Sequence, residues 1–167
     1  MKLRNFILIV AALGVLGYGV YAGAIRQSPA PGVTFTSIKG EKISTADLRG
    51  RVVLVNFWAT DCPVCVKEMP RMVETYNKHR AGGFELIAVA MRHDPPNYVL
   101  SYTEKNALPF KVALDPMGAL ARAFDDVRLT PTSILIDKRG NIVTRILGEP
   151  DFTKLDALIA EKLAEAA

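Results

Sequence analysis

The only two cysteines of this 167-residue chain, Cys62 and Cys65, stand three positions apart. Two thiols at this spacing can close into a disulfide, but a ring of so few residues removes little conformational entropy from the unfolded chain. A structural role for such a bridge is therefore not expected. The spacing favours thiol chemistry, which leaves disulfide exchange or metal binding.

Metal binding is the simpler alternative for the cysteine pair. A structural zinc site has four ligands, usually two cysteine pairs or one pair with two histidines. The chain has two histidines, His79 and His93, and neither belongs to a second ligand pair. The sequence therefore favours a redox dithiol, which requires no metal and no cofactor.

The residues around the pair predict how it is positioned. Residues 52–57 form a nearly unbroken apolar run with β-branched side chains, which is typical of a central strand buried on both faces. Apolar residues then recur at helical spacing, at Val66, Met69, Val73 and Tyr76. Cys62 is thus expected where a strand ends and a helix begins, with Pro63 in the first turn, where its missing N–H costs nothing.

This position predicts different roles for the two thiols. A helix N-terminus presents unpaired N–H groups and the positive end of the helix dipole, and both stabilise a thiolate. Cys62 should therefore have a lowered pKa and act as the attacking nucleophile. Cys65, one turn into the helix, is more shielded and should resolve the mixed disulfide.

The N-terminal segment predicts export. Lys2 and Arg4 precede an uncharged stretch that runs from residue 5 to residue 25. At roughly 1.5 Å per residue, a helix of this length just spans a bilayer core. The alternative is a cleaved signal peptide, since Ala22-Gly23-Ala24 supplies the small residues of a cleavage site.

We expect residues 1–25 to be a signal anchor, residues 26–32 a linker, and residues 33–167 one domain. The two basic residues at the start should stay on the cytoplasmic side, which places the domain across the inner membrane, in the periplasm. The net charge of +4 includes no basic cluster with interleaved aromatic residues, so nucleic-acid binding is not expected.

The rest of the chain alternates between predicted strands and predicted helices. A hairpin is predicted at 35–43, followed by a helical turn that Ser44 would cap. Strands are predicted at 84–91, 110–114, 132–136 and 142–147, and helices at 97–106, at 118–124 and after Asp151. This order indicates an α/β fold with a mixed central sheet and helices on both faces.

Residues 33–165 resemble a thioredoxin-fold protein, and more narrowly the membrane-anchored TlpA/ResA/DsbE group of thiol–disulfide oxidoreductases. The helix and strand expected between Pro95 and Leu114 match the central insertion of that group. The resemblance is carried by Asn56 to Thr60, the Cys62-Pro63-Val64-Cys65 pair, Lys67 to Pro70, and Thr130-Pro131-Thr132 followed by Ile134 to Gly140.

The resemblance implies roles for two more residues. Pro131 would be cis and lie beside the disulfide, leaving the backbone of Thr130 free to pair with an extended partner segment. Glu68, by position alone, is a surface glutamate near a helix N-terminus. In the resembling group a glutamate at this place lies under the dithiol and handles protons, so Glu68 would accept the Cys65 proton.

Asn56 occupies a strand position where many thioredoxins have a buried aspartate. An asparagine cannot take a proton, so that task would pass to Glu68; the simpler interpretation is a hydrogen bond to buried backbone. Asp61 departs from the group, which usually has tryptophan there. Its carboxylate should disfavour a thiolate on Cys62 by repulsion between like charges.

At three further places the residues predict a structural role. Trp58 should pack in the core or at the rim of the active site. The segment Arg92-His93-Asp94 is expected to be a solvated loop. His79 suits the negative end of a helix dipole and needs no function.

We therefore expect an exported, membrane-tethered monomer that reduces disulfides of periplasmic proteins, for example in cytochrome c or copper-site maturation. Its electrons would come from a membrane donor. Three alternatives remain: an oxidant that donates its disulfide, a peroxidase of the peroxiredoxin class, and a copper-binding or delivery module that holds Cu(I) with both thiolates. The adjacent Cys65 argues against the peroxidase.

Overall fold

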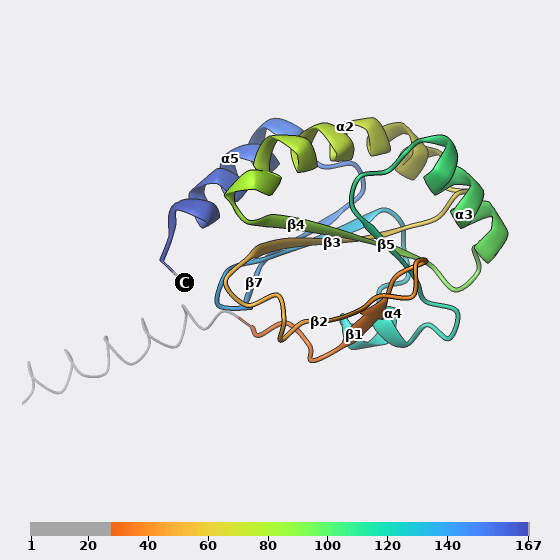
Figure 1. Ribbon diagram of the computed structural model, residues 1–167, viewed down its shortest axis with the longest axis horizontal. Coiled ribbons are helices and arrows are strands. Elements are labelled where there is room, and N and C mark those ends of the chain that lie inside the picture. Colours follow the sequence, from red (N-terminus) through yellow and green to blue (C-terminus); the bar gives the residue numbers. More distant parts are fainter. Residues whose placement is uncertain (1–27, 167) are drawn as a thin grey trace, which may run out of the picture.

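The computed structural model describes residues 28–166, so the predicted anchor at 1–25 lies outside the described residues. A five-stranded sheet forms the centre of the domain, with the strand order β5-β4-β3-β6-β7 (Figure 1). The strands are β3 (Val52–Trp58), β4 (Phe84–Ala90), β5 (Lys111–Leu114), β6 (Thr132–Ile136) and β7 (Ile142–Leu147).

The sheet is mixed, as the sequence predicts. β3 pairs in parallel with β4, and β4 in parallel with β5, whereas β6 runs antiparallel to both β3 and β7. In the β3–β6 register Phe57 lies opposite Thr132. The end of β3 therefore lies beside the start of β6, and this brings the Pro131 segment to the residues that follow β3.

The alternation of side chains along β3 divides the core into two layers. Leu54 and Trp58 pack with the helices α2 (Pro63–His79), α3 (Pro96–Lys105) and α5 (Phe152–Ala164). Val55 and Phe57 face the other layer, which contains the short helix α4 (Ala119–Ala123) and the hairpin of β1 (Thr34–Thr36) and β2 (Lys42–Ser44). Helices thus cover both faces of the sheet (Figure 1).

After Ser44, where a short helical turn is predicted, the chain forms consecutive hydrogen-bonded turns and no regular helix. Ser44 and Asp47 do exchange hydrogen bonds: Asp47 N donates to Ser44 Oγ across 3.2 Å, and Ser44 N donates to Asp47 Oδ2 across 3.1 Å. Gly50 follows with φ at 83° and turns the chain into β3 before a helix can form.

The buried face of α2 includes most of the predicted one and is wider. Met69 is 2% exposed and Val73 and Tyr76 are partly buried against the core, whereas Val66 is 36% exposed. The apolar pattern does not show the full face because three of the buried residues are polar. The buried residues are Cys65, Glu68, Met69, Met72, Thr75 and His79.

The described part of the predicted linker lies against the turn between β6 and β7. Ala30 N donates to the Gly140 carbonyl oxygen across 2.9 Å, and Ile142 N donates to the Ser28 carbonyl oxygen across 2.8 Å. Thr45 Oγ1 also donates to the carbonyl oxygen of Pro31 across 3.0 Å. Among the helices of residues 28–166, none is both long enough and apolar enough to cross a membrane.

Candidate active site

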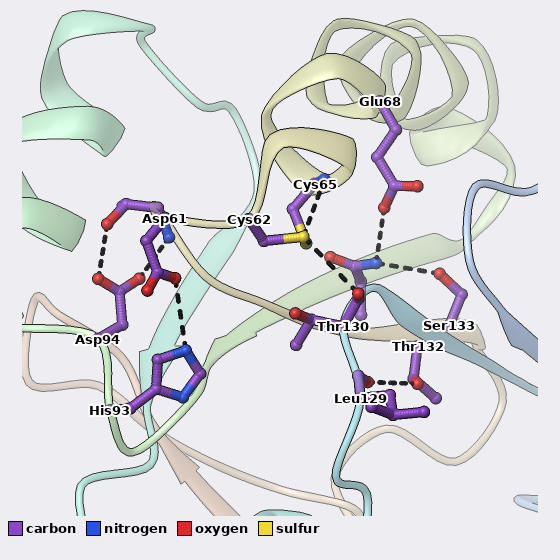
Figure 2. The surroundings of a disulfide bond; sticks show 12 residues. Asp61, Cys62, Cys65, Glu68, His93, Asp94, Leu129, Thr130, Thr132 and Ser133 are labelled. Carbon is purple, nitrogen blue, oxygen red and sulfur yellow. Dashed lines mark hydrogen bonds and ion pairs between the residues drawn. A yellow bond between two sulfur atoms is a disulfide. The ribbon is translucent and has the colours of Figure 1, made fainter.

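Cys62 and Cys65 lie at the junction that the sequence predicts. β3 ends at Trp58, and α2 begins at Pro63 with Cys62 as its N-cap. The two cysteines form a disulfide with their Cα atoms 5.2 Å apart. Cys65 N also donates to Cys62 Sγ across 3.3 Å (Figure 2).

The two sulfur atoms differ in their access to solvent. Cys62 is half-buried, whereas the Cys65 side chain is 0% exposed. Only Cys62 is open to a partner, and its sulfur already accepts a hydrogen bond from the first turn of α2. Such a bond stabilises a thiolate at this position more than at Cys65.

The Pro131 segment lies against the disulfide. The Thr130–Pro131 peptide bond is cis, as the resemblance implies. The carbonyl oxygen of Thr130 is 3.7 Å from Cys62 Sγ (Figure 2). Thr132 Oγ1 donates to the Leu129 carbonyl oxygen across 2.7 Å and closes the turn that leads into β6. The backbone of Thr130 thus lies directly beside the sulfur of Cys62.

Glu68 lies beneath the dithiol and is not a surface residue. Its side chain is 0% exposed, and it follows Cys65 by one helical turn. Asn56 Nδ2, from β3, donates to Glu68 Oε1 across 3.2 Å and to Ser133 Oγ, from β6, across 3.0 Å (Figure 2). The Asn56 side chain thus bonds to other side chains, and the simpler prediction of backbone bonding is not what the structure shows.

Burial makes Glu68 a proton exchanger near neutral pH. Loss of solvent raises the pKa of Glu68 from 4.5 to about 7, and the hydrogen bond from Asn56 only partly offsets this rise. Glu68 Oε2 has no hydrogen-bond partner within the described chain. A carboxyl group with this pKa can take up or release a proton at physiological pH, close to the thiol that must lose one.

The prediction of a solvated loop at residues 92–94 is wrong for Asp94. Its side chain is 5% exposed. Asp94 Oδ2 accepts from Thr60 N, and Asp94 Oδ1 accepts from Thr60 Oγ1, each across 2.6 Å. The segment after β4 therefore holds the loop that carries the cysteines. The sequence signal was the position of Asp94 after a strand end, where polar side chains often face a site.

Asp61, directly before Cys62, has a partner on the same segment. His93 Nε2 lies 3.4 Å from Asp61 Oδ1, and the two side chains are 51% and 72% exposed (Figure 2). A protonated His93 partly offsets the negative charge that Asp61 places beside Cys62. Both side chains are solvated, so this ion pair is weak.

Trp58 and His79 are both packed in the core. Trp58 is 0% exposed and its ring centroid lies 5.2 Å from that of Tyr102, which confirms the predicted packing role. His79 is 9% exposed, with Nε2 3.4 Å from Asp156 Oδ1. Within the described residues, neither side chain forms a hydrogen bond with Cys62 or Cys65.

Exposed apolar side chains flank the disulfide on three segments. Val64 is 41% exposed, Leu129 is 62% exposed and Leu147 is 63% exposed. Leu129 directly precedes Thr130, and Leu147 pairs with Thr132 in the sheet.

Within residues 28–166, no three side chains of His, Cys, Asp or Glu gather in a way that could hold a metal ion.

The structure thus brings together all four residues predicted for the site: Cys62, Cys65, Glu68 and Pro131. It adds Ser133, Asp94 and Thr60, which were not predicted as site residues. Ser133 carries no local sequence signal, because it acts through a partner on another strand, and Thr60 belongs to the motif that carries the resemblance, which assigns it no role.

The chain is similar to known proteins over most of its length. The family model described as Redoxin matches residues 26–159. Thiol-disulfide oxidoreductase ResA of Bacillus thuringiensis subsp. konkukian is 33% identical over 161 residues, which cover 92% of this chain and 92% of that protein. The protein of the same name from Geobacillus kaustophilus is 33% identical over 155 residues, covering 89% and 87%.

Solved structures show the same fold. The crystal structure of a thiol:disulfide interchange protein of the thioredoxin family from Chlorobium tepidum is 29% identical, with a TM-score of 0.76 over 83% of this chain and 98% of that chain. StoA from Bacillus subtilis is 27% identical, with a TM-score of 0.66 over 77% and 98%. The chain is therefore similar in sequence and structure to proteins named for disulfide chemistry.

Proposed function

This chain belongs to the Redoxin family and is a thiol–disulfide oxidoreductase, and we propose that it is a reductant of disulfides in exported proteins. The observation that supports this direction of electron flow is the presence of two carboxyl groups near the dithiol. Glu68 lies beneath it, and Asp61 directly precedes Cys62. Ionised carboxyl groups oppose the stabilisation that the helix N-terminus gives the Cys62 thiolate, and a dithiol whose reduced form is less stabilised gives up electrons more readily.

The reaction begins with the reduced protein. The Cys62 thiolate attacks a partner disulfide, so that a Cys62–partner bond forms and the partner's other sulfur leaves as a thiolate. Cys65 then passes its proton to Glu68 and attacks Cys62 Sγ. The Cys62–Cys65 disulfide forms and the partner's second sulfur leaves as a thiolate. The two partner thiolates take up protons from Glu68 and water, and two electrons have moved from the protein to the partner.

The assignment of Cys65 as the resolving thiol rests on burial. At 0% exposure Cys65 cannot reach a partner in solution, yet its Cα lies 5.2 Å from that of Cys62. Replacing Cys65 with serine should therefore trap the Cys62–partner intermediate. Replacing Cys62 with serine should trap nothing, and this variant is the matched control.

The proposed compartment follows from the N-terminal sequence. Lys2 and Arg4 precede the apolar stretch of residues 5–25, which is typical of an inner-membrane signal anchor. The domain would then act in the periplasm, with a membrane protein as its electron donor. Its partners would be exported proteins with reducible disulfides, such as those that receive haem or copper. Alkaline phosphatase fused after Ala167 is active only in the periplasm, so an inactive fusion would contradict export.

The reduction potential tests the direction of electron flow. The purified protein is equilibrated with dithiothreitol or glutathione buffers at pH 7, and the oxidised fraction is measured by alkylation. A potential near or below about −250 mV, close to that of thioredoxin, supports a reductant. A potential near about −120 mV, close to that of a strong oxidant, would instead make the protein a disulfide donor.

A further inference from the structure

A groove of about 560 Å³ is lined by His93, whose side chain contacts Asp61 next to Cys62, and by Arg128, two residues before Thr130. One wall is the segment after β4, the second is α4 with the turn before it, and the third is the segment that leads to Thr130. Figure 2 shows two of these walls reaching the site, with His93 beside Asp61 and Leu129 beside Thr130. The lining residues are Met91, Arg92, His93, Gly118, Ala121, Arg122, Asp126, Val127 and Arg128.

The groove carries more positive than negative charge. It contains three arginines and one carboxylate, Asp126, whose oxygen accepts hydrogen bonds from Arg128. Within residues 28–166, Arg92 and Arg122 form no ion pair. Arg122 donates only to the carbonyl oxygen of Met117, across 2.9 Å.

The two uncompensated arginines converge on one place in the groove. Gly118 has φ at 64°, and a Cβ at this position would lie 3.2 Å from Arg122 Nη1 and 3.4 Å from Arg92 Cδ. The absence of a side chain at Gly118 therefore lets both arginines approach the same point. The Arg122 guanidinium and the Arg92 side chain thus line the same part of the groove; both side chains are cationic, and the N–H donors of a guanidinium match a carboxylate.

Within residues 28–166, none of the neighbouring carboxylates forms an ion pair with Arg92 or Arg122. Asp115 is buried and accepts from the backbone N–H groups of Leu120 and Ala121. Asp94 is buried and bonds with both oxygens to Thr60. Asp61 faces His93 at the end of the groove nearest the disulfide.

We propose that this groove binds acidic side chains of the polypeptide whose disulfide reacts with Cys62. The inference rests on the proposed function, because that reaction places an extended partner segment along Thr130. An extended chain advances about 3.3 Å per residue, so side chains a few positions from the reacting cysteine reach the groove. The chain would thus select partners with Asp or Glu beside the reactive cysteines.

Ion pairs with exposed arginines predict a moderate preference for acidic partner segments, and this preference should depend on salt. Arg92 and Arg122 are exposed, and each exposed ion pair contributes little in water. Complementary charge mainly speeds the encounter with the right partner. We expect the preference to appear in kcat/KM and to shrink as salt screens the charges.

The test uses two synthetic peptides that share one intramolecular disulfide and differ only in flanking residues, glutamates in one and glutamines in the other. The full-length protein should reduce the glutamate peptide roughly two- to ten-fold faster in kcat/KM. This ratio should fall toward one between about 10 mM and about 1 M salt. R92Q, which removes no hydrogen bond or ion pair among the described residues, should lower the ratio, and R92Q/R122Q should abolish it.

R80Q is the matched control, because Arg80 is exposed, has no ion pair within residues 28–166 and follows the far end of α2 from the cysteines. It should leave the ratio unchanged. Equal rates for the two peptides in the wild type, or an unchanged ratio in R92Q/R122Q, would overturn the inference. Binding of phosphatidylglycerol vesicles that depends on Arg92, with equal peptide rates, would also overturn it and assign the groove to lipid. If neither peptide is reduced, the proposed function fails instead.

Discussion

Asn56 Nδ2 donates a hydrogen bond to Glu68 Oε1 across 3.2 Å, and both side chains are almost fully shut off from solvent. The bond links β3 to α2 directly beneath the cysteines. An amide cannot titrate, so Glu68 is the member of this pair that can exchange a proton. Asn56 sets the proton affinity of Glu68, because its N–H donates to the carboxylate and lowers the pKa that burial has raised.

E68Q tests the proton transfer. In the wild type, the rate at which Cys65 resolves a mixed disulfide should rise with pH through an inflection near 7, the raised pKa of Glu68. E68Q should lose this inflection, and its rate near neutral pH should fall by roughly ten-fold or more. Stopped-flow release of a chromogenic partner thiol measures the step. A wild-type inflection retained in E68Q would remove Glu68 from the mechanism.

N56L should shift the same inflection to higher pH. The substitution removes the hydrogen bond that lowers the pKa of Glu68, so burial acts unopposed. S133A is the matched control, since Ser133 bonds to Asn56 but has no hydrogen bond to Glu68. The pH profile of S133A should stay close to that of the wild type. Equal shifts in both variants would mean that general loosening of the core is the cause.

Folding stability should depend on pH through Glu68. The folded protein holds the Glu68 proton up to about pH 7, whereas an unfolded chain releases it near 4.5. Between these values rising pH removes protons from the unfolded chain first, so it favours unfolding. The free energy of unfolding of the oxidised wild type should therefore fall across this interval, by at most about 3 kcal/mol relative to E68Q. Urea titrations at several pH values measure it, and parallel curves would contradict it.

D61N should lower the pKa of the Cys62 thiol. The substitution removes a carboxylate next to the sulfur, and with it the repulsion that disfavours the thiolate. Thiolate absorbance of the reduced protein, followed against pH, gives the titration. E74Q is the control, because Glu74 is an exposed carboxylate in the second half of the same helix. Superimposable curves for D61N and the wild type would refute the prediction.

D94A should destabilise the protein through the loop that carries the cysteines. The substitution leaves the Thr60 N–H and hydroxyl without their acceptors, and an unsatisfied buried group costs about 1–3 kcal/mol. T60V removes only the hydroxyl bond, so its cost should be smaller, about 1 kcal/mol. Denaturant midpoints measure both. A D94A protein as stable as T60V would show that the backbone bond contributes nothing.

The sequence predicts the site where the signal is local. The apolar run before Cys62 and Pro63 just after it are enough to place the cysteines at a strand-to-helix junction, and the structure has this junction at Trp58 and Pro63. The cis bond at Pro131 came from the family resemblance, since an X–Pro bond alone favours trans.

The sequence fails where burial depends on a distant partner. Glu68 looks like a surface residue by type, yet it is buried and bonds to Asn56, 12 positions away in the chain. Asp94 looks solvated, yet it pairs with Thr60, 34 positions away. Such pairs depend on the register of β3 against its neighbours, which no local pattern encodes.

The hydrogen bonds of Ser28 and Ala30 to the β6–β7 turn determine where the start of the described chain lies on the domain. β6 starts next to Pro131 at the disulfide, and its five residues carry the chain about 17 Å to that turn. The described chain therefore begins at the end of the domain opposite the cysteines. A protein held at a bilayer through the residues before Ser28 would turn its dithiol outward, where large folded partners can approach without meeting the lipid surface.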